Sequence, residues 1–346
     1  MRAALLAACA LTAWLLPAHA QEAPLISSTE WAAYQEKFVD GTGRVIDDAN
    51  GNISHSEGQG YGMLLAYEAG DRAAFARIWS FTQTELLLRD DGLAVWKWDP
   101  SATPHVVDAN NATDGDLLIA YALSLAGKRW PDTSYTASAA TIAEAIGRET
   151  IQSWSGMVLL KPGVAGFGPK DRPDGPVVNP SYWIFEALPA MQALAPAHDW
   201  EGLRASGLAI LARLPDAPSP LPPDWLSLHA APKPAAGFDP VFGYNALRIP
   251  LYLIRAQVDR MDLVERMLKP MSGKDGGLAL VDVTSGAATA TLSDPGYRIQ
   301  RALAACMVDG QPIPAELMTF TPTQYYPSTL HLLALSHIRE ARPPCG

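Results

Sequence analysis

The sequence predicts a single-domain, all-α fold. Apolar residues recur at helical spacing behind helix-entry signals along most of the chain. Strand signals are few and short, and no alternation of strands with helices suggests a parallel sheet. The 346 residues leave room for roughly a dozen helices with their loops, which suits an all-α toroid better than a four-helix bundle.

Composition narrows the classes of function. With 48% hydrophobic and 18% charged residues, the chain lacks the low hydrophobicity and high charge of a disordered protein. Its formal net charge of −10 argues against a nucleic-acid partner. Three cysteines in a chain of this length exclude a small disulfide scaffold. These numbers predict a soluble, acidic, globular protein.

Residues 1–20 have the pattern of a secretory signal peptide. Arg2 precedes the apolar stretch Ala3–Leu16, and Ala18-His19-Ala20 provides a small-x-small cleavage site. We therefore expect residues 21–346 to form one mature domain that is secreted or periplasmic. This part has no run of eighteen apolar residues, so we do not expect it to be embedded in a membrane. It keeps Cys306 and Cys345, and their spacing alone does not say whether they pair.

Local signals place the helix starts in order. Ser27-x-x-Glu30 is a capping box, Asp71 is expected to cap the helix after it, and Thr113 is expected to be the N-cap of another. Further helices are expected near residues 136–152, 181–195, 200–213, 244–257, 259–269, 295–307 and 325–341. The other predicted elements are two short strands and two Pro-rich loops, at 158–160, 278–281, 161–180 and 214–240.

The first candidate functional segment is Ser54–Gly62, which has glycine at positions 58, 60 and 62. Each glycine costs a helix about 1 kcal/mol relative to Ala, so we expect them to allow a tight turn or the close approach of a ligand. Glu57 lies just before an apolar helix that begins near Met63. A carboxylate there either caps the helix N-terminus or, with its pKa raised by burial or a second carboxylate, acts as a catalytic acid.

The second candidate segment is Asp108–Asp116, in which Asp114 and Asp116 form an Asp-x-Asp pair. Three interpretations are open at this point. The carboxylates cap the following helix, or one of them belongs to an active site, or they bind a metal ion. The segment offers few ligands for a metal ion, since no EF-hand pattern follows it.

The third candidate segment, Phe242–Arg248, brings Tyr244, Asn245 and Arg248 into one helix entry. Aromatic residues lie beside polar groups elsewhere as well. Together they suit a neutral sugar polymer, whose apolar ring faces stack on aromatic side chains. Paired carboxylates suit the acid–base cleavage of such a polymer. The other aromatic clusters lie at 96–99, 181–183 and 325–326.

Several motifs, spread over nearly the whole mature chain, resemble those of one known family. Ser56–Met63 reads Ser-Glu-Gly-Gln-Gly-Tyr-Gly-Met, and Ala112–Leu123 begins Ala-Thr-Asp-Gly-Asp. These two motifs resemble those of glycoside hydrolase family 8. Three further segments resemble the family as well: 179–182, 222–225 and Tyr244-x-Ala246-x-Arg248. Within the family they are most similar to the periplasmic endoglucanases encoded with bacterial cellulose synthases.

The resemblance implies an (α/α)6 barrel of six inner and six outer helices, with a cleft across one end. It implies endo-hydrolysis of β-1,4-glucan with inversion, and no cofactor or metal ion is expected. Glu57 would be the general acid, and Asp114 would contact the sugar at the cleavage point and orient the water. The bracing and substrate-binding residues would be Asp116, Arg248, Trp96, Tyr182, Tyr244, Asn245 and Tyr325. The implied partner is a cellulose chain, with the cellulose synthase export complex as a further candidate.

Asn245 departs from the family pattern, because close relatives commonly carry Asp there as the general base. An amide accepts no proton near neutral pH, although it can hold the nucleophilic water. Three interpretations stay open. Another carboxylate is the base, with Asp239 as the first candidate and Asp114 as the second; or the enzyme works slowly without a strong base; or the chain binds glucan without cutting it.

Two functions compete with that of a β-1,4-glucanase. The same fold can act on another β-1,4 polymer, such as chitosan or xylan. Alternatively, the chain is a non-catalytic cellulose-binding component of an export machinery. Asn245 favours the second alternative, whereas the intact Glu57 and Asp114 argue against it. A metalloenzyme would be indicated only by loss of activity with a chelator.

Overall fold

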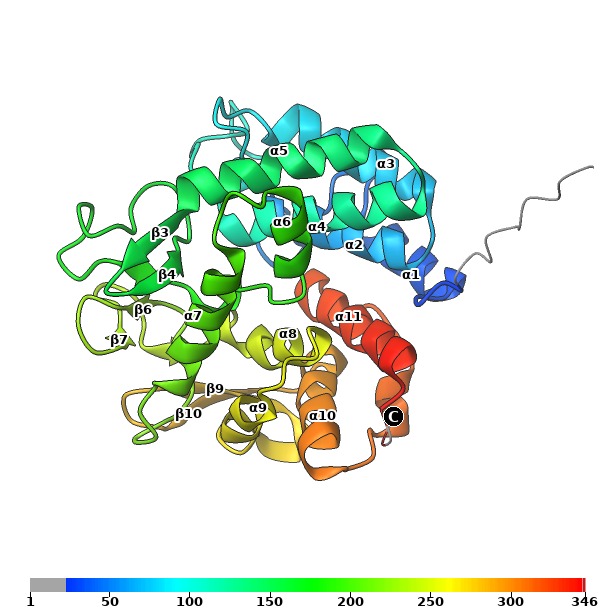
Figure 1. The fold of residues 1–346 in the computed structure, drawn as a ribbon. Coiled ribbons are helices and arrows are strands. Elements are labelled where there is room, and N and C mark those ends of the chain that lie inside the picture. Colours follow the sequence, from blue (N-terminus) through cyan, green and yellow to red (C-terminus); the bar gives the residue numbers. More distant parts are fainter. Residues whose placement is uncertain (1–22, 344, 346) are drawn as a thin grey trace, which may run out of the picture.

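The computed structural model describes residues 23–343 and 345, and over these residues the fold is helix-rich (Figure 1). Eleven α-helices in this part of the chain confirm the helical character predicted from the periodicity. None of these helices is both long and apolar enough to cross a membrane. The predicted signal peptide, residues 1–20, lies outside the described residues. The helices are α1 Ser28–Phe38, α2 Ser56–Glu68, α3 Arg72–Phe81, α4 Thr113–Arg129, α5 Thr133–Thr150, α6 Leu188–Leu194, α7 Trp200–Ala212, α8 Ile249–Arg255, α9 Met261–Leu268, α10 Pro295–Asp309 and α11 Tyr325–Ala341.

The helices pack in pairs that are consecutive in the sequence. α2 packs with α3, α4 with α5, α6 with α7, α8 with α9, and α10 with α11. A second set of contacts joins one pair to another: α2 with α4, α4 with α6, α8 with α10, and α11 with α2. In Figure 1, α3 and α5 lie at the outer edge, whereas α2, α4 and α8 lie nearer the middle. Almost every residue of α2 is buried, as expected for a helix packed on several sides.

Local caps explain where several helices begin. Ser27 and Glu30 make both hydrogen bonds of the predicted capping box at the start of α1. The carboxylates of Asp71 and Asp294 accept backbone N–H groups in the first turns of α3 and α10. These starts are confirmed, and the bounds of α11 coincide with the predicted helix at 325–341.

The start of α4 differs from the prediction. Its N-cap is Ala112, and Thr113 is the first residue of the helix. The hydroxyl of Thr113 donates at 2.7 Å to the carbonyl of Lys161, which follows the strand at 157–160. Thr113 therefore fastens the beginning of α4 to a distant loop, a contact that no local signal indicates.

The glycine-rich segment lies inside α2 and does not form the expected turn. α2 runs from Ser56 to Glu68 and contains all three glycines. A Cβ atom at Gly60 would lie 2.5 Å from the Cβ atom of Leu118 on α4. Real side chains do not approach so closely, so the absence of a side chain at Gly60 lets α2 and α4 cross at short distance.

The helices predicted at 181–195 and 244–257 are shorter in the structure. A separate 3₁₀ turn precedes each one, over Pro180–Tyr182 and Ala246–Arg248, and α6 and α8 begin after these turns. Both helices have proline in the first turn, where its missing N–H removes no helical hydrogen bond. The last residue of each turn is a site candidate: Arg248 directly precedes α8, whereas Tyr182 is separated from α6 by a short connecting segment.

Ten short strands lie in connecting segments of the described chain, where two were predicted. The two predicted strands are confirmed as β4 and β9. Most of the others have only two residues, which is too short for a period-2 pattern, and several of these order the Pro-rich loops. The antiparallel sheets are β1 Ser54–His55 with β2 Lys97–Trp98; β3 Ile151–Trp154 with β4 Met157–Leu160; β5 Val177–Val178, β6 Leu226–Ser227 and β7 Lys233–Pro234; and β8 Val241–Phe242, β9 Leu278–Asp282 and β10 Ala288–Leu292.

A disulfide closes the C-terminal part of the chain. Cys306 on α10 is bonded to Cys345, which answers the question that the spacing left open. The backbone N–H of Ile313 also donates to the carbonyl of Cys345 at 3.1 Å. The segment after α11 is thereby fastened to α10.

Candidate active site

Three charged candidates from distant parts of the sequence meet at one end of the inner helices. Glu57 lies in the first turn of α2, Asp114 lies in the first turn of α4, and Arg248 directly precedes α8. Nη1 of Arg248 lies 2.7 Å from Oε2 of Glu57, and Nη2 lies 2.7 Å from Oδ2 of Asp114. One guanidinium therefore holds both carboxylates, and we call these three side chains the Arg248 cluster.

The Arg248 cluster is buried except at Glu57. The side chains of Arg248 and Asp114 are 1% exposed, whereas that of Glu57 is 19% exposed. Nη2 of Arg248 also donates to the hydroxyl of Ser181 at 3.1 Å, and the guanidinium lies over the ring of Tyr182. These contacts fix Arg248, so Glu57 is the member of the cluster that can meet a ligand.

Burial determines how the cluster holds its protons. Burial, together with the carboxylate of Glu57, raises the pKa of Asp114 to about 7 against the opposing charge of Arg248. Burial also acts to raise the pKa of Glu57. The positive charges of Arg248 and His55 have the larger effect, so the pKa of Glu57 is lowered. Two carboxylates that share one guanidinium titrate as a unit. This unit keeps one proton up to near-neutral pH, which is a requirement for acid catalysis.

His55 supports Glu57 from the end of β1. Its Nδ1 accepts the backbone N–H of Gly58 at 2.9 Å, so His55 is the N-cap of α2. Its Nε2 lies 3.5 Å from Oδ2 of Asp47. Burial acts to lower the pKa of His55, but Asp47 and the charge of Glu57 outweigh it and raise that pKa. In the neutral form of His55, Nδ1 accepts the capping bond and the Nε2 proton is directed at Asp47.

Glu57 opens into a cleft of about 780 Å³. Asn245 and Arg248 line this cleft as well, and Tyr244 lines it with a side chain that is 52% exposed. The rest of the lining comes from residues 47–55 and 291–297 and from the start of α11. An exposed tyrosine ring in the same cleft as a carboxylate suits stacking against the apolar face of a sugar ring.

Asp224 holds the turn that carries Asn245. Its Oδ1 accepts the backbone N–H groups of Gly243 at 3.0 Å and Ala246 at 2.8 Å, and its Oδ2 lies 3.5 Å from Nδ2 of Asn245. Burial raises the pKa of Asp224, against the effect of these donors. The contact directs the amide nitrogen of Asn245 toward Asp224, which leaves the amide oxygen as the acceptor available to a water molecule.

Asp116 has a different set of contacts from Asp114. It is completely buried, and it accepts the backbone N–H of Ala94 at 2.8 Å and Nδ2 of Asn111 at 2.9 Å. Burial raises its pKa to about 7. Asp116 therefore braces the segments ahead of α4 from inside the protein.

The four predicted aromatic residues lie in different environments. Tyr182 is 9% exposed and lies under the guanidinium of Arg248. Tyr325 lines the cleft, but its side chain is 1% exposed. Trp96 is half-buried, donates from Nε1 to Asp108 at 2.8 Å, and is not among the described residues that line the cleft. Of these four, Tyr244 offers the most open ring.

Asp239 lies in an exposed loop, and it is not among the described residues that line the cleft. Next to it, Phe238 stacks on Trp225 with 4.7 Å between ring centroids, and Trp225 stacks in turn on Phe167 at 5.4 Å. This stack anchors the loop. The structure thus brings Glu57, Asp114, Arg248, Asn245 and Tyr244 together and leaves Asp239 apart, and its role as a base stays a prediction.

Three polar residues near the site have no role in the sequence analysis. His55 lies in the first candidate segment beside Glu57, so its position alone was a usable signal. Asp224 lies in a Pro-Pro-Asp-Trp motif, but a carboxylate in a Pro-rich loop has the pattern of an ordinary turn residue. Asp47 has no local signal, because its contact with His55 exists only in the folded chain.

The metal interpretation of the Asp-x-Asp pair has no geometric support. Asp114 faces Arg248, whereas Asp116 faces Ala94 and Asn111. Within the described residues, no group of three or more His, Cys, Asp or Glu side chains is arranged to hold a metal ion. The site offers a retained proton, an amide for a water molecule and an aromatic surface. This combination can hydrolyse a bond by acid–base chemistry.

Comparisons with known proteins point to the same chemistry. The family model described as glycosyl hydrolases family 8 matches residues 4–339. A probable endoglucanase of Novacetimonas hansenii is 35% identical over 322 residues, which cover 91% of this chain and 92% of that protein. An endoglucanase of Cellulomonas uda is 39% identical over 229 residues, which cover 66% of this chain and only 63% of that protein.

Solved structures are similar over most of the chain. An endo-β-1,4-glucanase from Acetobacter xylinum superposes with a TM-score of 0.81 and 33% identity, covering 90% of this chain and 98% of the other. A family 8 endoglucanase from Klebsiella pneumoniae superposes with a TM-score of 0.80 and 32% identity, covering 90% of this chain and 100% of the other.

Proposed function

Because this chain belongs to the glycosyl hydrolases of family 8, as an endoglucanase, we propose that it cuts internal β-1,4 linkages of a glucan with inversion at the anomeric carbon. The observation that carries this proposal is the Arg248 cluster, which sets two carboxylates on one guanidinium beside an open cleft. Glu57, the exposed member, is the general acid. Asp114, buried behind it on the same guanidinium, stores the proton.

The acid step uses the proton that the cluster retains. In the free enzyme Arg248 and His55 favour the ionised form of Glu57, and Asp114 keeps its proton to about pH 7. A sugar that enters the cleft displaces water from Glu57, which disfavours its charged form. The proton then resides on Glu57 and passes to the departing glycosidic oxygen as the bond to the anomeric carbon breaks.

Asn245 is proposed to hold the water that attacks the anomeric carbon. Its nitrogen faces Asp224, so its oxygen can accept a hydrogen bond from that water. The amide does not take up the proton that the water loses. Asp239 and Asp114 remain the proposed acceptors, and without a strong base the reaction would be slower by about 10²- to 10⁴-fold.

One alternative substrate is favoured by a specific feature of the cleft. Asp47 and Asp294 line it together with Glu57, against one arginine. Such an acidic lining also suits the cationic polymer chitosan. A non-catalytic glucan-binding protein remains the alternative that Asn245 favours.

The remaining proposals concern the whole chain. We propose that the helix pairs close into an (α/α)6 barrel. The proposal is supported by the contacts of α2 with α4, α4 with α6, α8 with α10 and α11 with α2, and by the contact between the 3₁₀ turns that precede α6 and α8. The pattern at residues 1–20 supports export of one domain, residues 21–346, to the periplasm or the medium. The motif resemblance supports a role in cellulose biosynthesis, with the export complex as a partner.

Release of reducing ends from carboxymethyl cellulose tests the proposed activity. The matched control is Glu57→Gln, which keeps the shape of the cleft but removes the proton donor. We expect this variant to bind glucan normally and to cut it at least about 10²-fold more slowly. Unchanged turnover in the variant would remove Glu57 from the role of acid. Binding without cleavage by the unaltered protein would favour the non-catalytic alternative.

A further inference from the structure

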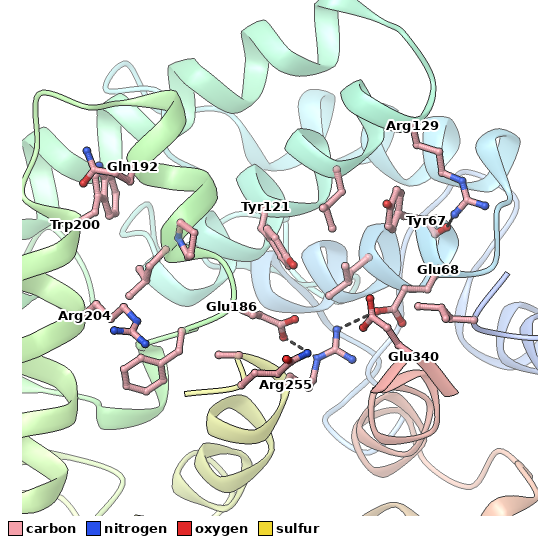
Figure 2. A pocket seen from close by; sticks show the side chains of 18 of the residues that line it. Tyr67, Glu68, Tyr121, Arg129, Glu186, Gln192, Trp200, Arg204, Arg255 and Glu340 are labelled. Carbon is pink, nitrogen blue, oxygen red and sulfur yellow. Dashed lines mark hydrogen bonds and ion pairs between the residues drawn. The ribbon is translucent and has the colours of Figure 1, made fainter. Parts of the chain in front are cut away.

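A second cavity lies at the other end of the same helices (Figure 2). Its volume is about 890 Å³, and we call it the far cavity. Glu57 begins α2 and Glu68 ends it, just as Arg248 precedes α8 and Arg255 ends it. At a rise of 1.5 Å per residue, Glu57 and Glu68 are about 16 Å apart along α2. The far cavity is therefore separate from the cleft.

The floor of the far cavity repeats the arrangement of the Arg248 cluster. Nε of Arg255 lies 2.7 Å from Oε1 of Glu186, and Nη2 lies 2.9 Å from Oε1 of Glu68. The side chains of Arg255, Glu186 and Glu68 are 6%, 9% and 5% exposed. Nη1 of Arg255 also donates to the carbonyl of Leu333 on α11 at 2.8 Å. The floor is thus rigid and charged, and none of the proposed catalytic residues belongs to it.

Glu68 is held by its neighbours in the floor. Burial, opposed by Arg255, raises the pKa of Glu68. The hydroxyl of Ser336 acts to lower this pKa, so the Glu68 carboxylate belongs to the rigid floor, and a ligand in the cavity gains its contacts from the walls.

The walls of the far cavity combine apolar and planar polar side chains. Figure 2 shows Tyr67 and Tyr121 on one side of the floor, and Gln192, Trp200 and Arg204 across from them. Tyr121 directs its hydroxyl toward the floor. Leucine and phenylalanine side chains from α2, α4 and the segment before α6 complete the lining.

The charges in the far cavity are largely paired with one another. Besides the Arg255 pairs, Arg204 lies 3.7 Å from Glu201, and Nη1 of Arg129 donates to the carbonyl of Tyr67 at 2.9 Å. Three arginines in the described lining would repel a cationic ligand, and four glutamates would repel an anionic one. The lining therefore favours a neutral ligand that both donates and accepts hydrogen bonds.

We propose that the far cavity is a second, non-catalytic saccharide site that binds a short cello-oligosaccharide. A glucose ring has an apolar face that can pack on the half-buried rings of Tyr67 and Tyr121. Its hydroxyl groups donate to carboxylates and accept from guanidinium groups. The volume lies within the range of about 300–1,000 Å³ typical of ligand sites. The inference takes only the class of sugar from the proposed function.

Counting the saccharide sites per chain tests this inference. In the Glu57→Gln protein, which does not turn over its ligand, calorimetric titration with cellotriose is expected to show two sites. Gln192→Trp fills the far cavity from an exposed position on α6 and is expected to leave one site. Ala193→Trp is the matched control, because Ala193 is exposed on the same helix outside the described lining, and it is expected to keep both sites.

Two results would overturn the inference: one site in the Glu57→Gln protein, or two sites after Gln192→Trp. Displacement of cellotriose from this site by spermidine would assign the cavity to cations instead. Should Gln192→Trp fail to fold, Tyr121→Phe replaces it, and we expect a loss of affinity of about three- to tenfold at one site only. Unchanged affinity at both sites in that variant would also overturn the inference. Two sites without any cleavage of glucan by the unaltered protein would contradict the proposed activity alone.

Discussion

Asn245 and Asp224 form a matched pair. Asp224 is buried under the turn, and its Oδ2 lies 3.5 Å from the amide nitrogen of Asn245. An amide can donate to that carboxylate, whereas an Asp at this position would place a second carboxyl group against it. The identity of residue 245 therefore affects the chemistry of the cleft and the stability of the turn together.

A carboxylate at residue 245 should supply a general base. We expect Asn245→Asp to raise turnover of carboxymethyl cellulose by about 10- to 100-fold, because it places a proton acceptor at the proposed water site. We also expect the pH optimum to move upward, since Asp224 raises the pKa of the new carboxyl group. Turnover measured against pH for both proteins checks the two effects.

Asp239→Asn in both backgrounds identifies the base of the unaltered chain. If Asp239 accepts the proton, this substitution abolishes cleavage in the unaltered protein and is tolerated in the Asn245→Asp protein. An equal, small effect in both backgrounds would contradict a role for Asp239. Unchanged turnover after Asn245→Asp would contradict the water site at residue 245.

Asp116 makes the stability of the protein depend on pH. Burial raises its pKa from 3.8 to about 7 in the folded chain. Below about pH 4 the folded and unfolded chains both hold this proton, so the titration of Asp116 does not change the free energy of unfolding. Toward pH 7 only the unfolded chain releases it, and the free energy of unfolding falls by up to about 4 kcal/mol.

Urea unfolding between about pH 4 and 7 measures this dependence. We expect Asp116→Asn to make the decline shallower, because its side chain does not titrate, while Asp114 continues to contribute over the same pH range. The exposed Asp309→Asn is the control and should keep the full decline. A variant and control with equal slopes would show that Asp116 does not hold its proton in the folded chain.

The crossing of α2 and α4 sets the spacing of the active site. Both helices carry a cluster carboxylate in their first turns, and Gly60 lets their backbones approach. A Cβ at this position would lie 2.5 Å from Cβ of Leu118 and 3.0 Å from the backbone nitrogen of Ile119. Any side chain at residue 60 must push the two helices apart and so separate Glu57 from Asp114.

We expect Gly60→Ala to lower the free energy of unfolding by about 1–3 kcal/mol, although Ala alone would favour the helix by about 1 kcal/mol. Turnover should fall as well, because the two carboxylates no longer share Arg248 at the same distance. Urea unfolding and reducing-end assays measure both effects. Gly41→Ala is the control, since a Cβ there meets nothing within 4 Å. If Gly60→Ala raised the free energy of unfolding instead, this would contradict the close crossing of α2 and α4 at Gly60.

The predictability of each element depends on where its determinants lie. The start of α1 is predictable because Ser27 and Glu30 close their own cap within four residues. The pairing of β5 with β6 joins 177–178 to 226–227, so no local pattern indicates it. The 3₁₀ turn ahead of α8 depends on Asp224 in another loop. The turn ahead of α6 has a local cap in Asn179, but it ends sooner than the helical pattern predicts.

The same distinction separates the residues of the site from their contacts. Motifs identify Glu57, Asp114 and Arg248, because each lies in a short characteristic segment. Their meeting is a property of the whole fold, since Asp114 and Arg248 are 134 residues apart. Asp224 shows the limit of motifs, because its burial under Asn245 depends on how two loops pack.

The disulfide joins the last helices of the fold across a wide loop. Cys306 and Cys345 are separated by 39 residues, so the bond restricts the unfolded chain considerably. We expect its reduction to lower the free energy of unfolding by about 3–4 kcal/mol, as estimated from the entropy of closing such a loop. Urea unfolding with and without a reductant measures the loss. The stability of the double variant Cys306→Ala/Cys345→Ala should not change with the reductant. If the reductant lowered its stability as much as that of the unaltered protein, the effect would not come from this disulfide.

The turn around Asn245 also governs how the site ages. Asparagine deamidates when the backbone nitrogen of the next residue attacks the side-chain amide carbon. Here that nitrogen belongs to Ala246, and its N–H is donated to the carboxylate of Asp224 at 2.8 Å. A nitrogen held in this way, next to a negative charge, neither loses its proton nor turns toward the amide. Spontaneous conversion of Asn245 to aspartate is therefore suppressed, and an old molecule should cut at the same rate as a newly made one.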